Sequence, residues 1–279
     1  MFHLAFSTNA FKKNSLDEAL AAVADAGYIG VELMADVPHA LPSALGRKER
    51  RDLMLRLVDL GLVVSNVNAF TLFACGDTYH PTWIEDDAAR RRERIDHTLA
   101  SIELAGEFAS KTVSLQPGGP LIGTGLSPEA AAERFAESLA EVLPRAREHE
   151  VTLAIEPEPG LLIQTSEEYL NFKRRFFPNE DLIHMNCDIG HLFCVGEDPA
   201  AVIRRMPGEI AHVHVEDIGR NRVHQHLAPG KGAIDFAAVF AALNDIAYDG
   251  WATVELYPYE TTAAQIAKAA MAHLRPLMS

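Results

Sequence analysis

Eight short apolar segments alternate with helical patterns along these 279 residues. The apolar segments fall near 3–7, 30–34, 62–67, 111–115, 151–156, 183–188, 210–215 and 251–256. Val, Ile and Leu dominate them, as in parallel strands that are covered on both faces. Helical periodicity is found between them at 16–27, 48–60, 86–106, 128–149, 166–176, 199–206, 236–247 and 262–276. The alternation predicts a parallel α/β fold in which one helix follows each strand.

Ionisable residues stand at the ends of the last four apolar segments and help to choose between two architectures. They are Glu156, Asp188, His214 and Glu255. In an open doubly wound sheet these four strand ends would lie along a line and could hardly meet. In a closed barrel they line one arc of its mouth and converge. The sequence therefore predicts a single-domain (β/α)8 TIM barrel over residues 1–279.

The same four residues form a predicted metal site. Any one of them taken alone is more often a solvated or structural residue, but four at consecutive strand ends lie on the face where barrels place catalysis. Three carboxylates and one imidazole suit a divalent cation. We expect one ion, Mn²⁺ in the first place because of its mixed oxygen and nitrogen ligands, with Mg²⁺, Co²⁺ and Zn²⁺ as alternatives.

The predicted ion suggests a class of reaction. With open coordination positions it would hold adjacent oxygens of a hydroxy-ketone and stabilise an enediolate. Glu156 and Glu255 flank the ion and would act as base and acid. We expect an isomerase or epimerase of a sugar, keto-sugar or sugar-like acid. The alternative is a lyase, in which the same enediolate expels a β-hydroxyl or glycosyl group from a keto-sugar, cyclitol or glycoside. A nuclease and a non-catalytic binding protein are weaker alternatives.

Composition bounds the partners and the setting. The formal net charge of −14 argues against a nucleic-acid partner. No apolar run reaches the roughly 18 residues of a membrane span. The start, MFHLAFSTNA, lacks the features of a signal peptide. Cys75, Cys187 and Cys194 have neither zinc-site spacing nor an even number for disulfides. We expect a cytoplasmic protein that binds a small carbohydrate-like substrate and no membrane.

Several motifs together resemble a known family. They are AFSTNAF and GVELMADVPH near the start, then IEPEP, DIGH, HVHVED and GWATVELYPY. The chain resembles the xylose isomerase-like TIM-barrel superfamily over nearly its whole length, in particular the sugar phosphate isomerase/epimerase group. The resemblance implies that the four strand-end residues are the metal ligands and that Glu156 and Glu255 are the acid/base pair. It also implies substrate contacts by His191 and Arg220, and it makes a homo-oligomer plausible.

One position departs from the family pattern. Ketose 3-epimerases carry a further Glu six residues after the ligand of the fifth strand, and this chain has Leu162 there. The departure puts a free-hexulose 3-epimerase in doubt and leaves the substrate open.

Further residues are expected to contact substrate, each with a structural alternative. Glu32 ends the second strand and would either reach substrate or form an ion pair inside the barrel mouth. Gln116 would bind a hydroxyl or loop backbone. The segment after the third strand carries Tyr79 and His80, and it is either a lid over the mouth or an Ω-loop packing on itself. His226 would reach the pocket from the 217–234 segment, which is otherwise a solvated loop.

Overall fold

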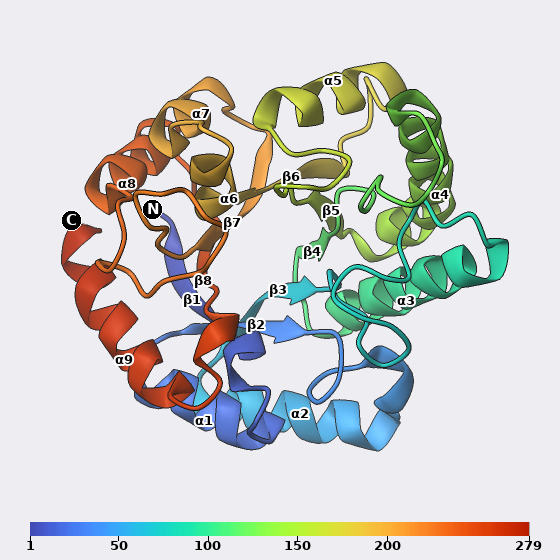
Figure 1. Cartoon of the computed structure of the whole chain (residues 1–279). Helices are drawn as coiled ribbons and strands as arrows, with labels where there is room; N and C mark the ends of the chain where they lie inside the picture. Colours follow the sequence, from blue (N-terminus) through green and yellow to red (C-terminus); the bar gives the residue numbers. More distant parts are fainter. Residues whose placement is uncertain (279) are drawn as a thin grey trace.

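The computed structural model describes residues 1–278 and contains a closed barrel of eight parallel strands. Neighbouring strands follow the chain order, and β1 pairs with β8 to close the ring. The strands are β1 His3–Ser7, β2 Gly30–Met34, β3 Val63–Asn68, β4 Thr112–Leu115, β5 Thr152–Ile155, β6 Ile183–Asp188, β7 Ile210–Val215 and β8 Trp251–Val254. Figure 1 shows the helices as an outer ring around these strands. The predicted (β/α)8 barrel is confirmed.

Helices follow the strands in chain order. They are α1 Leu16–Asp25, α2 Arg47–Leu60, α3 Ala88–Glu107, α4 Pro128–His149, α5 Ser166–Phe176, α6 Ile189–Cys194, α7 Pro199–Arg205, α8 Phe236–Asp245 and α9 Ala263–Leu274. Short 3₁₀ turns occur at η1 Thr8–Phe11, η2 Pro42–Ala44, η3 Tyr257–Tyr259 and η4 Arg275–Leu277. Helix α6 was not predicted, because its six residues are too few to show a helical period.

Local sequence explains where these helices begin and end. Capping boxes start α1, with Ser15 and Glu18, and α5, with Thr165 and Glu168. In each box the hydroxyl accepts from a backbone N–H and the glutamate binds the capping residue's own N–H. Helix α2 ends at Gly61, whose φ of 66° is easily reached by glycine. The predicted boundaries are therefore close to the observed ones.

The barrel register brings polar side chains from neighbouring strands to the same height. Asp188 on β6 is paired with His214 on β7, and His214 is paired with Thr253 on β8. In the same layer, Ser65 Oγ and Thr253 Oγ1 lie 3.2 Å apart across the interior. Because alternate residues of a strand face inward, this register stacks a polar layer under the carboxyl ends of the strands.

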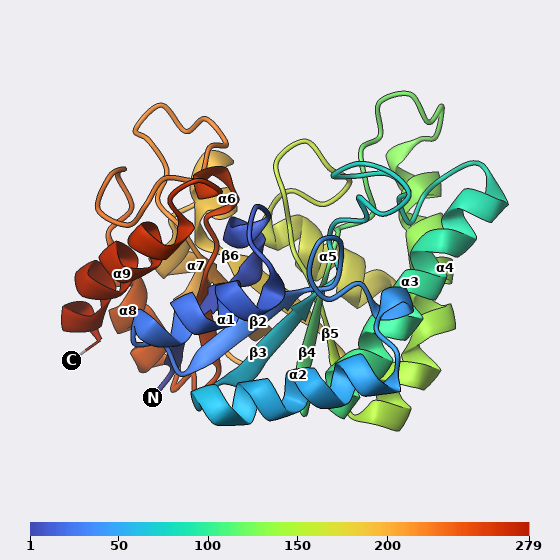
Figure 2. The same ribbon diagram turned by 90° about the horizontal axis from the view of Figure 1, so that it is seen from below.

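The loops after the strands gather at one end of the barrel. Figure 2 shows the long loops after β3, β4, β5 and β7 rising together, away from the end where the N-terminus lies. They cover 69–87, 116–127, 156–165 and 216–235. Within residues 1–278 no helix has the length and apolarity needed to cross a membrane.

Candidate metal centre and active site

The four predicted metal ligands converge at the loop-bearing end of the barrel. Glu156, Asp188, His214 and Glu255 are all buried, and one ligand atom from each lies within 4.8 Å of the others. His214 Nδ1 is 3.1 Å from Glu156 Oε1, 3.9 Å from Asp188 Oδ2 and 3.8 Å from Glu255 Oε1. The imidazole nitrogen is thus surrounded by the three carboxylates. The geometry has the spacing that a single cation needs between its ligands.

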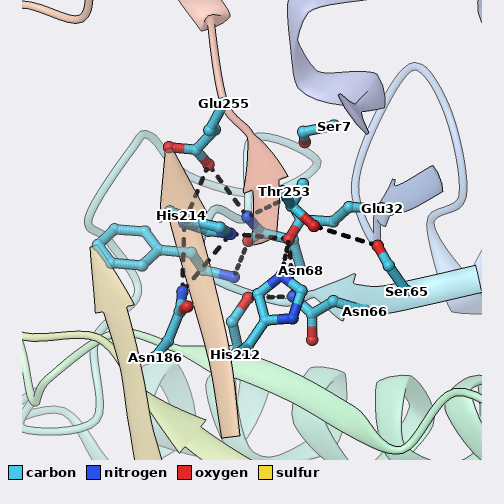
Figure 3. Close-up of polar contacts among 12 residues, drawn as sticks. Ser7, Glu32, Ser65, Asn66, Asn68, Asn186, His212, His214, Thr253 and Glu255 are labelled. Atoms are coloured by element: carbon cyan, nitrogen blue, oxygen red, sulfur yellow. Dashed lines mark hydrogen bonds and ion pairs between the residues drawn. The ribbon is translucent and has the colours of Figure 1, made fainter. Parts of the chain in front are cut away.

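A fifth ionisable residue fixes the orientation of His214. Glu32 Oε2 lies 2.7 Å from His214 Nε2, on the side of the ring away from the carboxylate cluster. Figure 3 shows Glu32 beside His214, with His212 below the ring and Glu255 above it. If Nε2–H donates to Glu32, the lone pair of Nδ1 points at the cluster centre. A carboxylate holding the second nitrogen of a metal-binding histidine is a common arrangement around metals.

Three asparagine side chains hold the glutamates of the cluster in place. Asn68 Nδ2 donates to Glu255 Oε1 at 3.2 Å, and Asn9 Nδ2 donates to the same oxygen at 2.8 Å. Asn186 Nδ2 donates to Glu156 Oε2 at 2.8 Å. Because these amides are buried, the two glutamates are restrained before any ligand arrives.

The donor set also fits a cation electrostatically. Asp188 Oδ1 accepts from the backbone N–H of His191, whereas the buried Oδ2 has no hydrogen-bond partner among residues 1–278. Burial raises the pKa of Glu156 and holds the pKa of Glu255 well above its usual range, and neighbouring carboxylates add to both effects. A divalent cation at the centre would supply Asp188 Oδ2 with a partner and offset the repulsion.

When only protein groups surround it, the His214 ring favours its charged form, with a proton on each nitrogen. Burial favours the neutral ring, but the carboxylates of Glu32 and Glu156 outweigh burial and raise the pKa of His214 well above its ordinary value. A metal ion that binds Nδ1 must therefore displace a proton.

A cavity of about 420 Å³ opens above the cluster. Glu156 and Glu255 contribute to its lining, and Phe70, Phe73 and Tyr257 supply an apolar wall. The volume lies in the range of small-molecule sites, and the mixture of apolar wall and few polar groups is typical of them.

Two of the predicted substrate contacts line this cavity. His191 is buried, with Nδ1 3.1 Å from the carbonyl oxygen of Pro157. His226 is buried against Tyr257, and its Nδ1 is 3.0 Å from the carbonyl oxygen of Glu255. Burial lowers the pKa of His191 to about 4 and that of His226 to about 3, so both rings are neutral near pH 7.

Four other predicted substrate residues lie away from the cavity lining. Glu32 has no exposed surface and pairs with His214 Nε2, which is the ion-pair alternative. Gln116 is also enclosed, and its Nε2 donates to the carbonyl oxygens of Thr78 and Tyr79. His80 and Arg220 do not line the cavity either. His80 Nδ1 lies 2.7 Å from Glu85 Oε1, and Arg220 is exposed on the 217–234 loop.

None of these four side chains lines the cavity, because each one points elsewhere. Glu32 lies in the middle of β2, and its buried side chain points at His214 in the barrel interior. The loop ends that carry Gln116 and His80 bind their own backbone or a neighbouring carboxylate. The tip of the 217–234 loop turns Arg220 to solvent.

Sequence reasoning missed several residues of the site. Asn186 and Glu216 stand two residues from Asp188 and His214, so strand alternation would have placed them on the same inward side. Glu216 is fully buried beside Asp188, and burial holds its pKa well above the usual range. Asn9 had no signal, because it reaches Glu255 only through the closure of the barrel.

Comparison with known proteins follows this geometry. The model of a family described as xylose isomerase-like TIM barrel matches residues 20–277. Inosose dehydratase of Clostridium perfringens is 24% identical over 261 residues, covering 88% of this chain and 83% of that protein. Inosose dehydratase of Lacticaseibacillus casei is 30% identical over 139 residues, covering 44% and 46%.

Solved structures share the fold. The IOLI protein with a binding zinc atom superposes with a TM-score of 0.79 at 20% identity, over 100% of this chain and 98% of that one. L-ribulose 3-epimerase superposes with a TM-score of 0.78 at 22% identity, over 100% of this chain and 95% of that one. Both likenesses extend over nearly the whole barrel.

Proposed function

The chain belongs to the xylose isomerase-like TIM barrel family, and we propose that it is a divalent-metal-dependent lyase that removes water from a cyclic keto-polyol or keto-sugar. The observation that carries the proposal is the convergence of Glu156, Asp188, His214 and Glu255 at the floor of a cavity of small-molecule size. These four residues would hold the ion, and Glu156 and Glu255 would also move protons.

The reaction uses the two glutamates in complementary roles. A bound divalent cation would polarise the substrate carbonyl and so acidify the adjacent C–H bond. One glutamate takes that proton, and the C–H electron pair becomes the new carbon–carbon double bond. The C–O bond to the β-hydroxyl breaks, and the second glutamate gives the leaving oxygen a proton, so that water departs. Asn9, Asn68 and Asn186 keep the two carboxyl groups oriented.

Elimination is favoured over isomerisation by the curated relatives. The relatives reported above are named inosose dehydratase, and a dehydratase is a lyase. The isomerase or epimerase expected first from the sequence becomes the second candidate. It shares proton removal and differs only in the fate of the carbanion, which is reprotonated. Mn²⁺ is the ion expected from the ligand set, and the zinc-bound neighbour makes Zn²⁺ an equal choice for testing.

The test is turnover of inosose by protein loaded with Mn²⁺ or Zn²⁺ in D₂O. We expect a UV-absorbing unsaturated product and metal-dependent loss of water. Incorporation of deuterium without loss of water would identify the isomerase or epimerase. Protein that holds stoichiometric metal but neither exchanges nor eliminates with inosose or a panel of ketohexoses would contradict both.

Variants separate proton transfer from metal binding. Glu156→Gln and Glu255→Gln should each lower turnover by about 10²–10⁴-fold, the usual contribution of one acid or base. Metal content, measured by elemental analysis, is determined on the same samples. Glu167→Gln on the exposed side of α5 is the matched control and should change neither quantity. Near-normal turnover in either active-site variant would refute the two-glutamate mechanism.

A further inference from the structure

A carboxyl group of the cavity that the proposed reaction does not use is Glu158. It belongs to the loop between β5 and α5, and its side chain lines the cavity while only 4% of the residue is exposed. It stands two residues after Glu156, across Pro157. An extended chain advances about 3.3 Å per residue, so the Glu158 backbone lies roughly 7 Å farther along the chain than that of Glu156. The cavity therefore has a second acidic position beyond its floor.

Contacts from two other loops reach this carboxyl group, and a third contact holds the Glu158 backbone within its own loop. The Tyr79 hydroxyl, from the loop after β3, donates to Glu158 Oε1 at 2.8 Å. His224 Nδ1, from the loop after β7, lies 3.8 Å from the same oxygen. The backbone N–H of Glu158 donates to the carbonyl oxygen of Ile163 at 3.1 Å. A side chain restrained in this way is preorganised, as recognition of a ligand requires.

The second oxygen of Glu158 is available to a ligand. Within residues 1–278 no protein group forms a hydrogen bond with Oε2. The neighbouring wall is apolar, with Phe70 packing near Tyr79 at a ring distance of 6.4 Å. A free carboxyl oxygen beside an apolar wall matches a polyol ring, whose C–H face packs on the wall while a hydroxyl forms a hydrogen bond with the oxygen.

We propose that Glu158, positioned by Tyr79, is a hydroxyl-binding subsite that reads one hydroxyl group of the substrate away from the reacting carbons. The ligand class is a polyhydroxylated ring, and the contact is a hydrogen bond between that hydroxyl and the Glu158 carboxyl group. The proposal rests on the proposed function, because it assumes that the polyol enters this cavity. A site built to bind a hydroxyl discriminates strongly against the analogue that lacks it.

The competing explanation is that Glu158 only anchors the loop that carries Tyr79. The two explanations differ in what removal of a substrate hydroxyl does. If Glu158 is only a loop anchor, replacing it should lower kcat/KM for every substrate by the same factor. If Glu158 is a subsite for one hydroxyl, replacing Glu158 should impair every substrate except the analogue in which that hydroxyl is replaced by hydrogen.

The experiment combines protein variants with substrate analogues. Metal-loaded wild type, Glu158→Gln and Tyr79→Phe are assayed with inosose and with each of its monodeoxy analogues, and KM, kcat and metal content are measured. Glu158→Gln should lower kcat/KM for inosose by about tenfold, mainly through KM, with metal content unchanged. With the wild type, kcat/KM for one monodeoxy analogue should be lower than for inosose by a similar factor. With that analogue, Glu158→Gln should cause no further loss of kcat/KM. Tyr79→Phe should give a smaller loss on the same analogue pattern, and Glu167→Gln none.

Three outcomes would overturn the subsite. Glu158→Gln could leave every kcat/KM unchanged, it could lower all of them by the same factor, or it could lose its metal. In each case wild-type turnover of inosose persists, so the proposed function stands while the subsite falls. A wild type that neither eliminates nor exchanges with any probe overturns the proposed function, and the subsite with it.

Discussion

Replacement of Glu32 by glutamine tests whether a residue with no access to the cavity controls the metal centre. The Glu32 carboxylate accepts from His214 Nε2 at 2.7 Å, from Asn66 Nδ2 at 2.8 Å and from Asn68 Nδ2 at 3.1 Å. Glutamine keeps the shape and one acceptor oxygen. Its NH₂ group, however, must face donors that previously met a charged oxygen. The variant therefore weakens the hold on the His214 ring without changing any proposed ligand.

The expected loss of metal affinity follows from the contacts, and its size depends on pH. Removing the carboxylate that holds a metal-binding histidine weakens metal affinity by about 10–100-fold, or about 1.4–2.8 kcal/mol. Glu32 also raises the pKa of His214, so wild type loses affinity to proton competition as pH falls. Glu32→Gln lowers that pKa and relieves part of the competition. The difference between the two proteins should therefore be largest near pH 9 and should shrink toward pH 6.

The assay is competition for Zn²⁺ against a chromophoric chelator at pH 6, 7.5 and 9. Glu167→Gln serves as the exposed carboxylate control and should bind like wild type at every pH. An affinity of Glu32→Gln equal to or above wild type at pH 9 would refute the reasoning. It would mean that Glu32 neither orients His214 nor contributes its charge to cation binding.

Three further predictions concern groups around the barrel. In wild type, metal affinity should rise by up to about tenfold per pH unit below the raised pKa of His214, because binding releases its proton, and a pH-independent affinity by calorimetry would contradict this. Arg94→Met removes the buried donors to the carbonyl oxygens of Pro81 and Ala69, at 2.8 Å each, and should cost about 2–5 kcal/mol in urea unfolding; a loss below about 0.5 kcal/mol would count against these bonds. Burial, with Arg94 nearby, lowers the pKa of His97 from 6.5 to about 3, so the unfolded chain binds a proton below pH 6.5 that the folded chain does not. The free energy of unfolding should therefore decrease as pH is lowered from 6.5 toward 3, by up to about 1.4 kcal/mol per pH unit from this group. His97→Gln should flatten the dependence of stability on pH, and an unchanged dependence would show that His97 does not contribute.

Strand and helix positions could be predicted because they depend on short-range patterns. The ends of β1, β2, β6 and β7 coincide with the expected ones, since short apolar segments bounded by capping and turn residues are readable without tertiary contacts. Helix α6 escaped notice, because it begins directly at Asp188, which ends β6 and caps the helix at once. Because Asp188 ends β6 and also caps α6, no turn or loop residues separate the strand from the helix in the sequence.

For the site, the predicted strand-end residues lie together, whereas three predicted loop residues lie away from the cavity. The four strand-end residues were expected to meet, and their ligand atoms do meet. The predicted roles of His80, Gln116 and Arg220 depended on where three loops would turn, and those loops turn the side chains to a neighbouring carboxylate, to backbone and to solvent. Loop direction is set by contacts with distant segments, which residue order does not reveal.

The sequence by itself determined the alternation of strands and helices and the residue types at the strand ends, because both arise from contacts between near neighbours in the chain. The tertiary structure alone decided that Asn9 would hold Glu255 across 246 residues and that Tyr79 would hold Glu158 across 79. It also decided that Glu32 would bind His214 Nε2 rather than line the cavity. These pairings follow from ring closure and strand register, which place residues by their height on a cylinder and not by their distance along the chain.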